Sequence, residues 1–131
     1  MPQLPIELIL MRELADLLAT PIFVVDGAGD LVFYNEPAEG LLGRRFEETG
    51  PMTANEWSTT FRPFSTDDGE PMPPADLPLV VALREGHASH ETFDIRALDG
   101  TIRHVAATAI PLLDANGDLV GAAALFWEAP R

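Results

Sequence analysis

The amino-acid sequence predicts a single α+β domain in which short helices cover an antiparallel sheet. Two observations lead to this class. Short runs rich in β-branched and aromatic residues follow one another through tight glycine-containing turns, as antiparallel strands do. Helical patterns precede and separate these runs. A chain of 131 residues is long enough for one sizeable core and too short for two, so all the elements must pack together.

The composition of the chain excludes several classes of protein. The 21 acidic residues outnumber the 8 basic ones, and the net charge of −13 repels nucleic acid and anionic membrane surfaces. We therefore expect neither a nucleic-acid partner nor direct membrane contact. No apolar run reaches the roughly 20 residues of a membrane span, and Glu7 stands where an export signal carries a basic residue. Cysteine is absent as well, so we expect a cytoplasmic protein.

Residues 1–19 form an amphipathic helix with a wide apolar face, made of two adjacent rows. One row consists of Leu4, Leu8, Met11, Ala15 and Leu18, and the other of Ile6, Leu10, Leu14 and Leu17. A small sheet usually covers only one such row, so the other is available to a second chain. We expect a homodimer through this helix, with Leu8, Leu10, Met11, Leu14 and Leu18 at the interface.

A β-hairpin follows the first helix. Residues 22–25 and 31–34 are its strands, and the glycine-containing segment 27–30 is its turn. Asn35 is placed to cap a short helix that ends near Gly43. The stretch from residue 44 to 63 is irregular, and the spacing of Trp57, Phe61 and Phe64 allows these rings to turn inward together.

The second half of the sequence reads as one helix and a three-stranded meander. Asp76 is placed to cap a helix over residues 77–85 that stops at Gly86. Strands follow over residues 90–98, 101–113 and 119–127, joined by turns at Asp99-Gly100 and Asn116-Gly117. The small residues 121–124 indicate that the last strand is central in the sheet and closely approached by a neighbour.

The sequence predicts no catalytic residue and no metal site. The acidic pairs Glu47-Glu48 and Asp67-Asp68 lie in loop-like sequence, where carboxylates are usually solvated. His87 and His90 lie where a helix gives way to a strand, so we expect a surface pair and not metal ligands. A two-residue turn at Asp99-Gly100 would place His104 opposite Ile95, facing inward, whereas one inserted residue would reverse that orientation.

The order and spacing of these motifs resemble those of a PAS domain of the bacterial signal-sensing type. The resemblance rests on residues 21–26, Gly29, residues 32–35, Ala38 and residues 41–43, and then on 68–71, 77–86, 99–101, 110–112 and 114–121. It implies a five-stranded antiparallel sheet in the order 2-1-5-4-3, with helices over one face, in addition to the N-terminal amphipathic helix. The PAS domain would span residues 20–128, with an exit segment at 129–131.

The resemblance also implies a sensory function without catalysis. A small ligand or dimerisation would act on the domain, which would relay a signal to an effector, such as a histidine kinase, that is not part of this chain. The pocket candidates are Asn35, Trp57, Phe61, Leu79, Leu83, Phe93, Ile95, His104 and Ala106. Two alternatives stay open: a ligand-free interaction module, and a small cone-shaped enzyme, which would need an acidic base inside its cavity.

No cofactor is assigned by the sequence. Relatives with an adducted flavin or a thioester-linked chromophore need a cysteine, which this chain lacks. Haem-binding relatives usually place a histidine on the long helix, and residues 77–85 contain none, so we do not expect haem. His87, which follows this helix, keeps haem as an open alternative. A non-covalent flavin is compatible with Asn55 and Trp57, but we favour Trp57 as a core residue.

Overall fold

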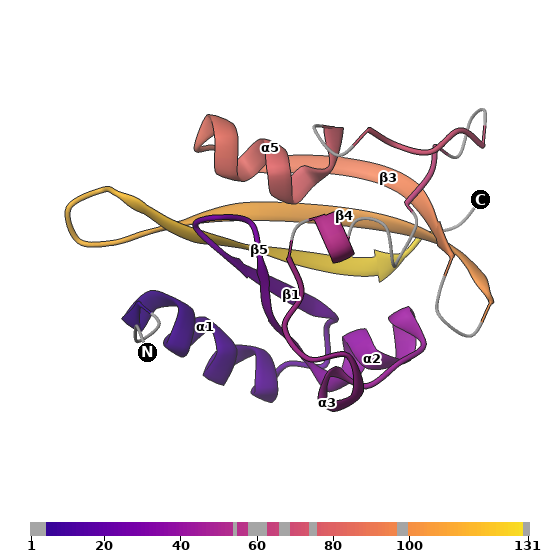
Figure 1. Ribbon diagram of the computed structural model, residues 1–131, viewed down its shortest axis with the longest axis horizontal. Helices are drawn as coiled ribbons and strands as arrows, with labels where there is room; N and C mark the ends of the chain where they lie inside the picture. The colour runs from indigo at the N-terminus through magenta and orange to yellow at the C-terminus, as the bar shows by residue number, and fades with distance from the viewer. Residues whose placement is uncertain are drawn as a thin grey trace.

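The computed structural model describes residues 5–53, 55–57, 63–65, 69–73, 76–96 and 100–129. Its elements are α1 (Ile6–Leu17), β1 (Ile22–Asp26), β2 (Leu31–Tyr34), α2 (Glu36–Leu42), α3 (Phe46–Thr49), α5 (Pro78–Glu85), β3 (Ser89–Arg96), β4 (Ile102–Leu113) and β5 (Leu119–Glu128) (Figure 1). A single helical turn at 55–57 lies between α3 and α5.

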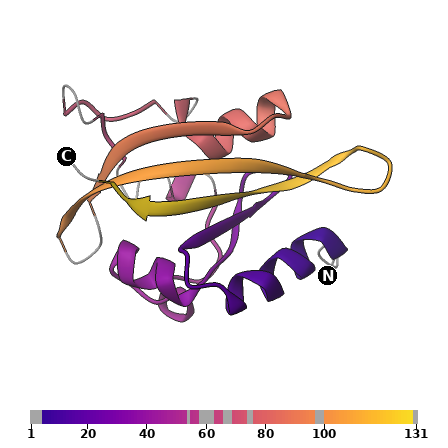
Figure 2. The same ribbon diagram turned by 180° about the vertical axis from the view of Figure 1, so that it is seen from behind.

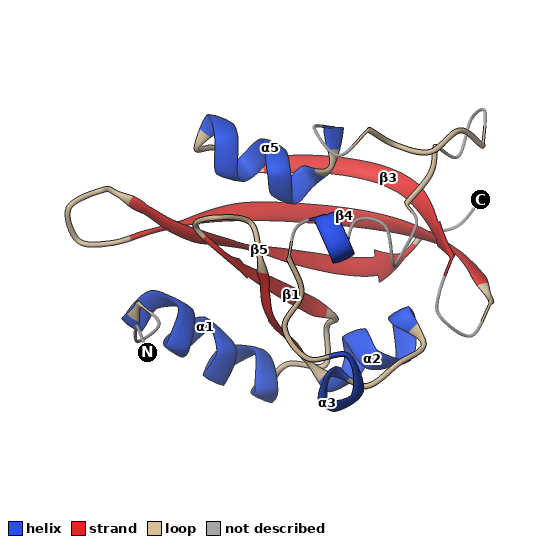
Figure 3. Cartoon of the chain, in the orientation of Figure 1, coloured by secondary structure: helices blue, strands red, loops and turns tan. Residues whose placement is uncertain are grey.

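The five strands form one antiparallel sheet in the order β2-β1-β5-β4-β3, which confirms the predicted topology. The strands make one curved layer among the helices (Figure 3). The long strand β5 is central, as the run of small residues predicts, and pairs with β1 on one side and β4 on the other. The predicted turns after β1 and β4 are both present, each with an aspartate side chain, Asp26 or Asp114, accepting two backbone N–H bonds.

The two faces of the sheet bury different elements. On one face, α2 and α5 pack over the main hydrophobic core. On the opposite face, α1 packs over a smaller cluster in which Leu8 and Ala15 meet Ile22, Val24 and Ala123. Figures 1 and 2 show α1 and α5 on opposite sides of the strands. The sheet therefore separates α1 from the core beneath α5.

The predicted register between β3 and β4 is wrong by one residue. His104 pairs with Asp94 and not with Ile95, because five residues, 97–101, separate the paired Arg96 and Ile102. The two-residue turn expected from Asp99-Gly100 would have joined the strands one residue out of this register. Since side chains alternate between the faces of a strand, a shift of one residue moves His104 and Ala106 to the face opposite the main core.

The start of α5 also differs from the prediction. The helix begins at Pro78, Leu77 occupies the N-cap position, and no side chain caps it. Asp76 lies one residue too early, and its N–H instead closes a tight turn on the Pro73 carbonyl. Proline suits the first position of a helix because that residue needs no N–H partner. The predicted end at Gly86 is confirmed by its left-handed φ of 72°.

Candidate functional site

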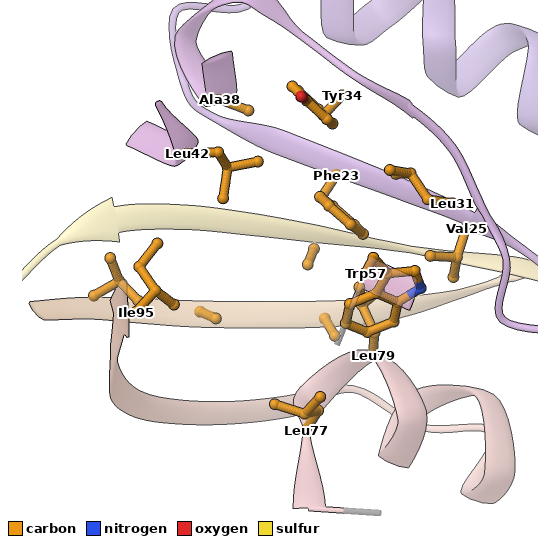
Figure 4. Close-up of a cluster of buried hydrophobic side chains, with 14 of the residues drawn as sticks. Phe23, Val25, Leu31, Tyr34, Ala38, Leu42, Trp57, Leu77, Leu79 and Ile95 are labelled. Atoms are coloured by element: carbon orange, nitrogen blue, oxygen red, sulfur yellow. The ribbon is translucent and has the colours of Figure 1, made fainter. Parts of the chain in front are cut away.

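A small cavity lies between the inner face of the sheet and α5 (Figure 4). Its volume is about 50 Å³. The described residues that line it are Phe23, Leu42, Trp57, Pro63, Leu77, Pro78, Leu79, Phe93, Ile95, Ala107, Ala124 and Phe126. Four strands, the start of α5 and the end of α2 thus contribute to the lining of this cavity, which is partly open to solvent.

Strand alternation brings this lining together. Phe93 and Ile95 are two residues apart on β3, as Ala124 and Phe126 are on β5, so each pair points to the same face of the sheet. Ala107 stands between these strands on β4, and its single methyl group leaves space at the centre of the sheet. A small residue flanked by large ones is what keeps this part of the core unfilled.

Aromatic rings form one wall of the cavity. The Phe23 ring meets the Trp57 ring edge-on, with centroids 5.2 Å apart, and meets the Phe126 ring in the same way at 6.4 Å. Trp57 is only 6% exposed, and its indole N–H donates to the Gly29 carbonyl at 2.8 Å. The interpretation of Trp57 as a core residue is confirmed, and its one polar group is used within the protein.

A capping box positions Trp57. The Thr53 hydroxyl accepts from the Glu56 N–H, and the Glu56 carboxylate accepts from the Thr53 N–H at 3.0 Å. These hydrogen bonds with Thr53 hold the pKa of Glu56 below its usual value. The spacing of Thr53 and Glu56 is a recognised start signal for a helix, so this turn was detectable in a stretch that the sequence analysis treated as irregular.

The structure brings together only some of the predicted pocket residues. Trp57, Leu79, Phe93 and Ile95 line the cavity. Leu83 packs against the core beside it. Phe61 lies outside the described residues.

His104 and Ala106 are corrections, because the register of β4 places them on the other face of the sheet. There His104 Nδ1 lies 2.7 Å from Asp94 Oδ1, and both side chains are largely buried. This pair of residues is therefore part of the outer face and not an anchor for a ligand in the cavity.

Asn35 is also absent from the described cavity wall, because its side chain is fully engaged elsewhere. The predicted N-cap is confirmed: Asn35 Oδ1 accepts from the Ala38 N–H at 3.2 Å. The same oxygen accepts from the Ile22 N–H, while Nδ2 donates to the carbonyls of Ala15 and Thr20, each at 2.9 Å. One buried amide thus joins α1, β1 and α2.

Sequence reasoning missed the contributions of the first hairpin and the last strand to the cavity. The sequence predictions give Phe23 no face of its strand, include Ala124 only among the small residues 121–124, and do not name Phe126. The signal was available, because Phe23 and Val25 alternate with Ile22 and Val24 in the same way as the inward residues of β3. Pro63 and Leu42 carry no comparable signal.

The histidines near β3 lie apart from the cavity. The His87 ring contacts the Ala88 carbonyl and Glu85 Oε1, and these two contacts raise its pKa. His90 contacts the Thr108 hydroxyl on β4 at 3.0 Å. In the part of the chain that the structure describes, no three metal-binding side chains gather into a site.

The surface of α1 carries a second candidate site. Leu8 and Ala15 are buried against the sheet, whereas the row of Ile6, Leu10, Leu14 and Leu17 is 64%, 56%, 47% and 83% exposed. Of the first row, Met11 also packs against the sheet cluster, Leu18 is 37% exposed, and Leu4 lies outside the described residues. Leu8 is a correction to the expected interface, because a side chain that is buried in its own domain is not available to a partner.

Comparisons with known proteins identify the architecture. Residues 15–129 match a family model described as the PAS fold. Among solved structures, the chain is similar to the PAS domain of BvgS from Bordetella pertussis, with 21% identity and a TM-score of 0.61 over 95% of this chain and 87% of that one. It is also similar to the fungal blue-light photoreceptor Vivid in its light-state dimer, with 12% identity and a TM-score of 0.64 over 84% and 78% of the two chains.

A third similar structure is a PAS domain from a two-component sensor histidine kinase, with 13% identity and a TM-score of 0.58 over 95% of this chain and 97% of that one. At such identities these likenesses establish the fold alone. A comparison with curated proteins gives no match. None of the helices in the described ranges has the length and apolar character needed to cross a bilayer.

Proposed function

The chain belongs to the PAS fold family, and on this premise we propose that it is a sensory module that holds a small ligand between the sheet and α5. Occupation of the cavity changes the output of an effector domain, such as a histidine kinase. The observation that carries the proposal is an apolar cavity, partly open to solvent, within the main core, where close packing is the rule for a purely structural domain.

The sheet offers a short route from the cavity to the opposite face. On β1, Phe23 faces the cavity and Val24 faces α1, and on β5 Ala124 and Ala123 divide in the same way. A ligand that makes better contacts with one arrangement of these strands shifts the population toward it. Because α1 packs on the reverse side of the same two strands, such a shift changes how α1 packs against the sheet.

Native mass spectrometry of the purified domain, combined with its visible absorption spectrum, tests this function. We expect one small molecule per chain that is released by mild denaturation. A domain that carries no molecule, and whose melting temperature no small molecule in a broad library changes, would contradict ligand sensing and favour the ligand-free interaction module.

Self-association through α1 is a second function, favoured by its exposed leucine row. Three leucines and Ile6 form a continuous apolar stripe on the solvent side of α1. Burial of each such side chain is worth about 1.5 to 3 kcal/mol. Two copies with a net charge of −13 repel, but salt screens this repulsion beyond about 8 Å at physiological ionic strength. A homodimer through Leu10, Leu14 and the neighbouring Leu17 therefore fits this surface.

We propose no catalytic role for the domain. An enzyme of the cone-shaped α+β class needs a carboxylate base inside its cavity. The described wall of this cavity consists of apolar side chains, and Asp94, the one buried carboxylate among the described residues, lies on the other face of the sheet. These placements support sensing over turnover.

A further inference from the structure

We propose that the ligand of this cavity is a small, uncharged, apolar molecule, and not a flavin, a haem or an organic acid. The inference rests on the proposed function, because it names the chemical class of ligand for the same site. Three properties of the described cavity wall lead to it: the chemistry of its side chains, the state of its polar backbone groups and its volume.

The described side chains of the wall offer a ligand no free hydrogen-bonding group. The twelve described residues include no charged, hydroxyl or amide side chain. The single polar side-chain group among them, the Trp57 indole N–H, already donates to the Gly29 carbonyl at 2.8 Å. A polar group that enters this space gives up its hydrogen bonds to water and gains none, which disfavours binding.

The described strand residues of the wall use their backbone groups within the sheet. Ala107 has paired strands on both sides, and so has Ala124, so their N–H and C=O groups lie inside the sheet. On the outer strand β3, Asp94 turns its N–H and C=O to Phe64, and those of Phe93 and Ile95 therefore face β4. Pro63 and Pro78 have no N–H to donate. The net charge of −13 adds a long-range repulsion for any anionic metabolite.

The volume limits the size of the ligand. The cavity measures about 50 Å³, whereas a dry apolar cavity of roughly 150 Å³ takes up benzene or xenon. A flavin or haem ring system is several times larger than either cavity and would require the core to open. The space fits a ligand of a few heavy atoms, or a single apolar ring if Leu79 and α5 move outward.

Methyl NMR of the full chain under xenon pressure, and separately with benzene, tests the assignment. We expect both probes to shift the methyl signals of Ile95 and Leu79, which line the cavity, and to leave those of Ile110 on the outer face unchanged. Flavin mononucleotide and citrate serve as the large polar and the charged probe, and neither should shift the Ile95 signals.

A matched pair of variants locates the effect. Ala107→Val fills the cavity and should abolish the xenon shifts, whereas Ala106→Val adds the same two carbons on the opposite face of β4 and should preserve them. Ala124→Val repeats the test from β5, and a thermal melt of each variant reports whether it folds.

The outcomes separate this inference from the proposed function. Binding of flavin mononucleotide or citrate at Ile95, without a response to xenon or benzene, would overturn the apolar class and leave a sensory cavity. If no probe shifts the methyl signals of Ile95 and Ala107→Val raises the melting temperature, the cavity is a packing defect. Both the sensory function and the apolar ligand class would then be refuted.

Discussion

Leu8 of α1 packs directly onto Gly121 of β5. A Cβ atom added to Gly121 would lie 2.7 Å from Leu8 Cδ2 and would also meet the Val25 carbonyl oxygen. The Val25 carbonyl is a backbone atom that cannot move aside, so glycine is required at this position for β5 to pair with β1 beneath Leu8. The N-terminal helix is thus an integral part of the fold, because Leu8 over Gly121, the buried Ala15 and the Asn35 bond to the Ala15 carbonyl all hold it to the sheet.

We predict that Gly121→Ala destabilises the domain by about 1 to 3 kcal/mol, as overpacking does. The added methyl group must displace Leu8 or separate β5 from β1. Gly40→Ala is the matched control, since nothing lies within 4 Å of a Cβ there and the residue is inside α2. This control should raise the free energy of unfolding by about 0.5 to 1 kcal/mol, because alanine is more favourable than glycine inside a helix. Urea denaturation measures both, and equal stability of Gly121→Ala and wild type would refute the packing argument.

Asn35→Ala should cost about 3 kcal/mol or more, well above the roughly 1 kcal/mol of a lost cap alone. The excess arises because the substitution also removes the partners of the Ile22 N–H and of the Ala15 and Thr20 carbonyls. Asn35→Ser retains a capping hydroxyl, so its stability cost should lie between those of the wild type and Asn35→Ala. Urea denaturation measures both variants, and an Asn35→Ala cost of about 1 kcal/mol with Asn35→Ser as stable as the wild type would show that capping is its whole contribution.

Local sequence signals predicted much of this fold. Alternating apolar residues, the Asn116-Gly117 turn and the Asn35 cap identified elements that the structure contains, because each depends on neighbours in sequence. The register of β3 against β4 was not predicted, since Asp99-Gly100 favours a two-residue turn and the strands actually pair outside it. That one-residue difference moved His104 from the inner face to the outer face.

The candidate site was predicted less completely than the fold. Phe93, Ile95 and Leu79 were found because strand and helix periodicity point them inward. The bonds from Asn35 to Ala15 and Thr20 span 20 and 15 residues, and the Trp57 bond to Gly29 spans 28. No local pattern encodes such contacts, so they emerge only when the elements pack.

Stability should decline above pH 10 because of Tyr34. Burial raises the pKa of this tyrosine above its ordinary value of 10.0, while its hydroxyl donates to the Arg44 carbonyl at 2.8 Å. As the pH rises, the tyrosine hydroxyl therefore loses its proton in the unfolded chain before it does so in the folded chain. The contribution of Tyr34 to the stability of the fold is complete below pH 10 and is lost as the pH rises through the folded-state pKa. The loss approaches about 1.4 kcal/mol per pH unit within that window.

The titration of Tyr34 can be measured without interference from other side chains. Tyr34 is its only tyrosine, and lysine and cysteine are absent from the sequence, so no other side chain titrates near pH 10. Tyrosinate absorbance of the folded and urea-unfolded chain gives the two pKa values, and denaturation at several pH values gives the stability. A folded-state titration that coincides with the unfolded one would contradict the prediction.

Leu14→Glu should weaken the homodimer at least tenfold, or about 1.4 kcal/mol, without unfolding the domain. Leu14 is exposed on α1, so a charge there disturbs only the proposed interface. Ile102→Glu is the control, because Ile102 is exposed to the same degree, 46% against 47%, but lies at the start of β4 and not on α1.

Sedimentation velocity at two salt concentrations distinguishes the outcomes for the dimer. Higher salt should strengthen association of the wild type, since it screens the repulsion between two chains of charge −13. A wild type that stays monomeric at tens of micromolar in physiological salt would rule out this interface. Deletion of α1 is not a suitable test, because Leu8 and Ala15 belong to the core.

Amide hydrogen exchange with the cavity empty and occupied tests the central claim most directly, namely that a ligand in the cavity changes the structure beyond it. Xenon serves as the occupant until the natural ligand is identified. The account predicts altered protection in α5, along β1 and β5, and in α1 on the far side of the sheet. Altered protection confined to the residues that touch the cavity, with α1 unchanged, would contradict a sensory role.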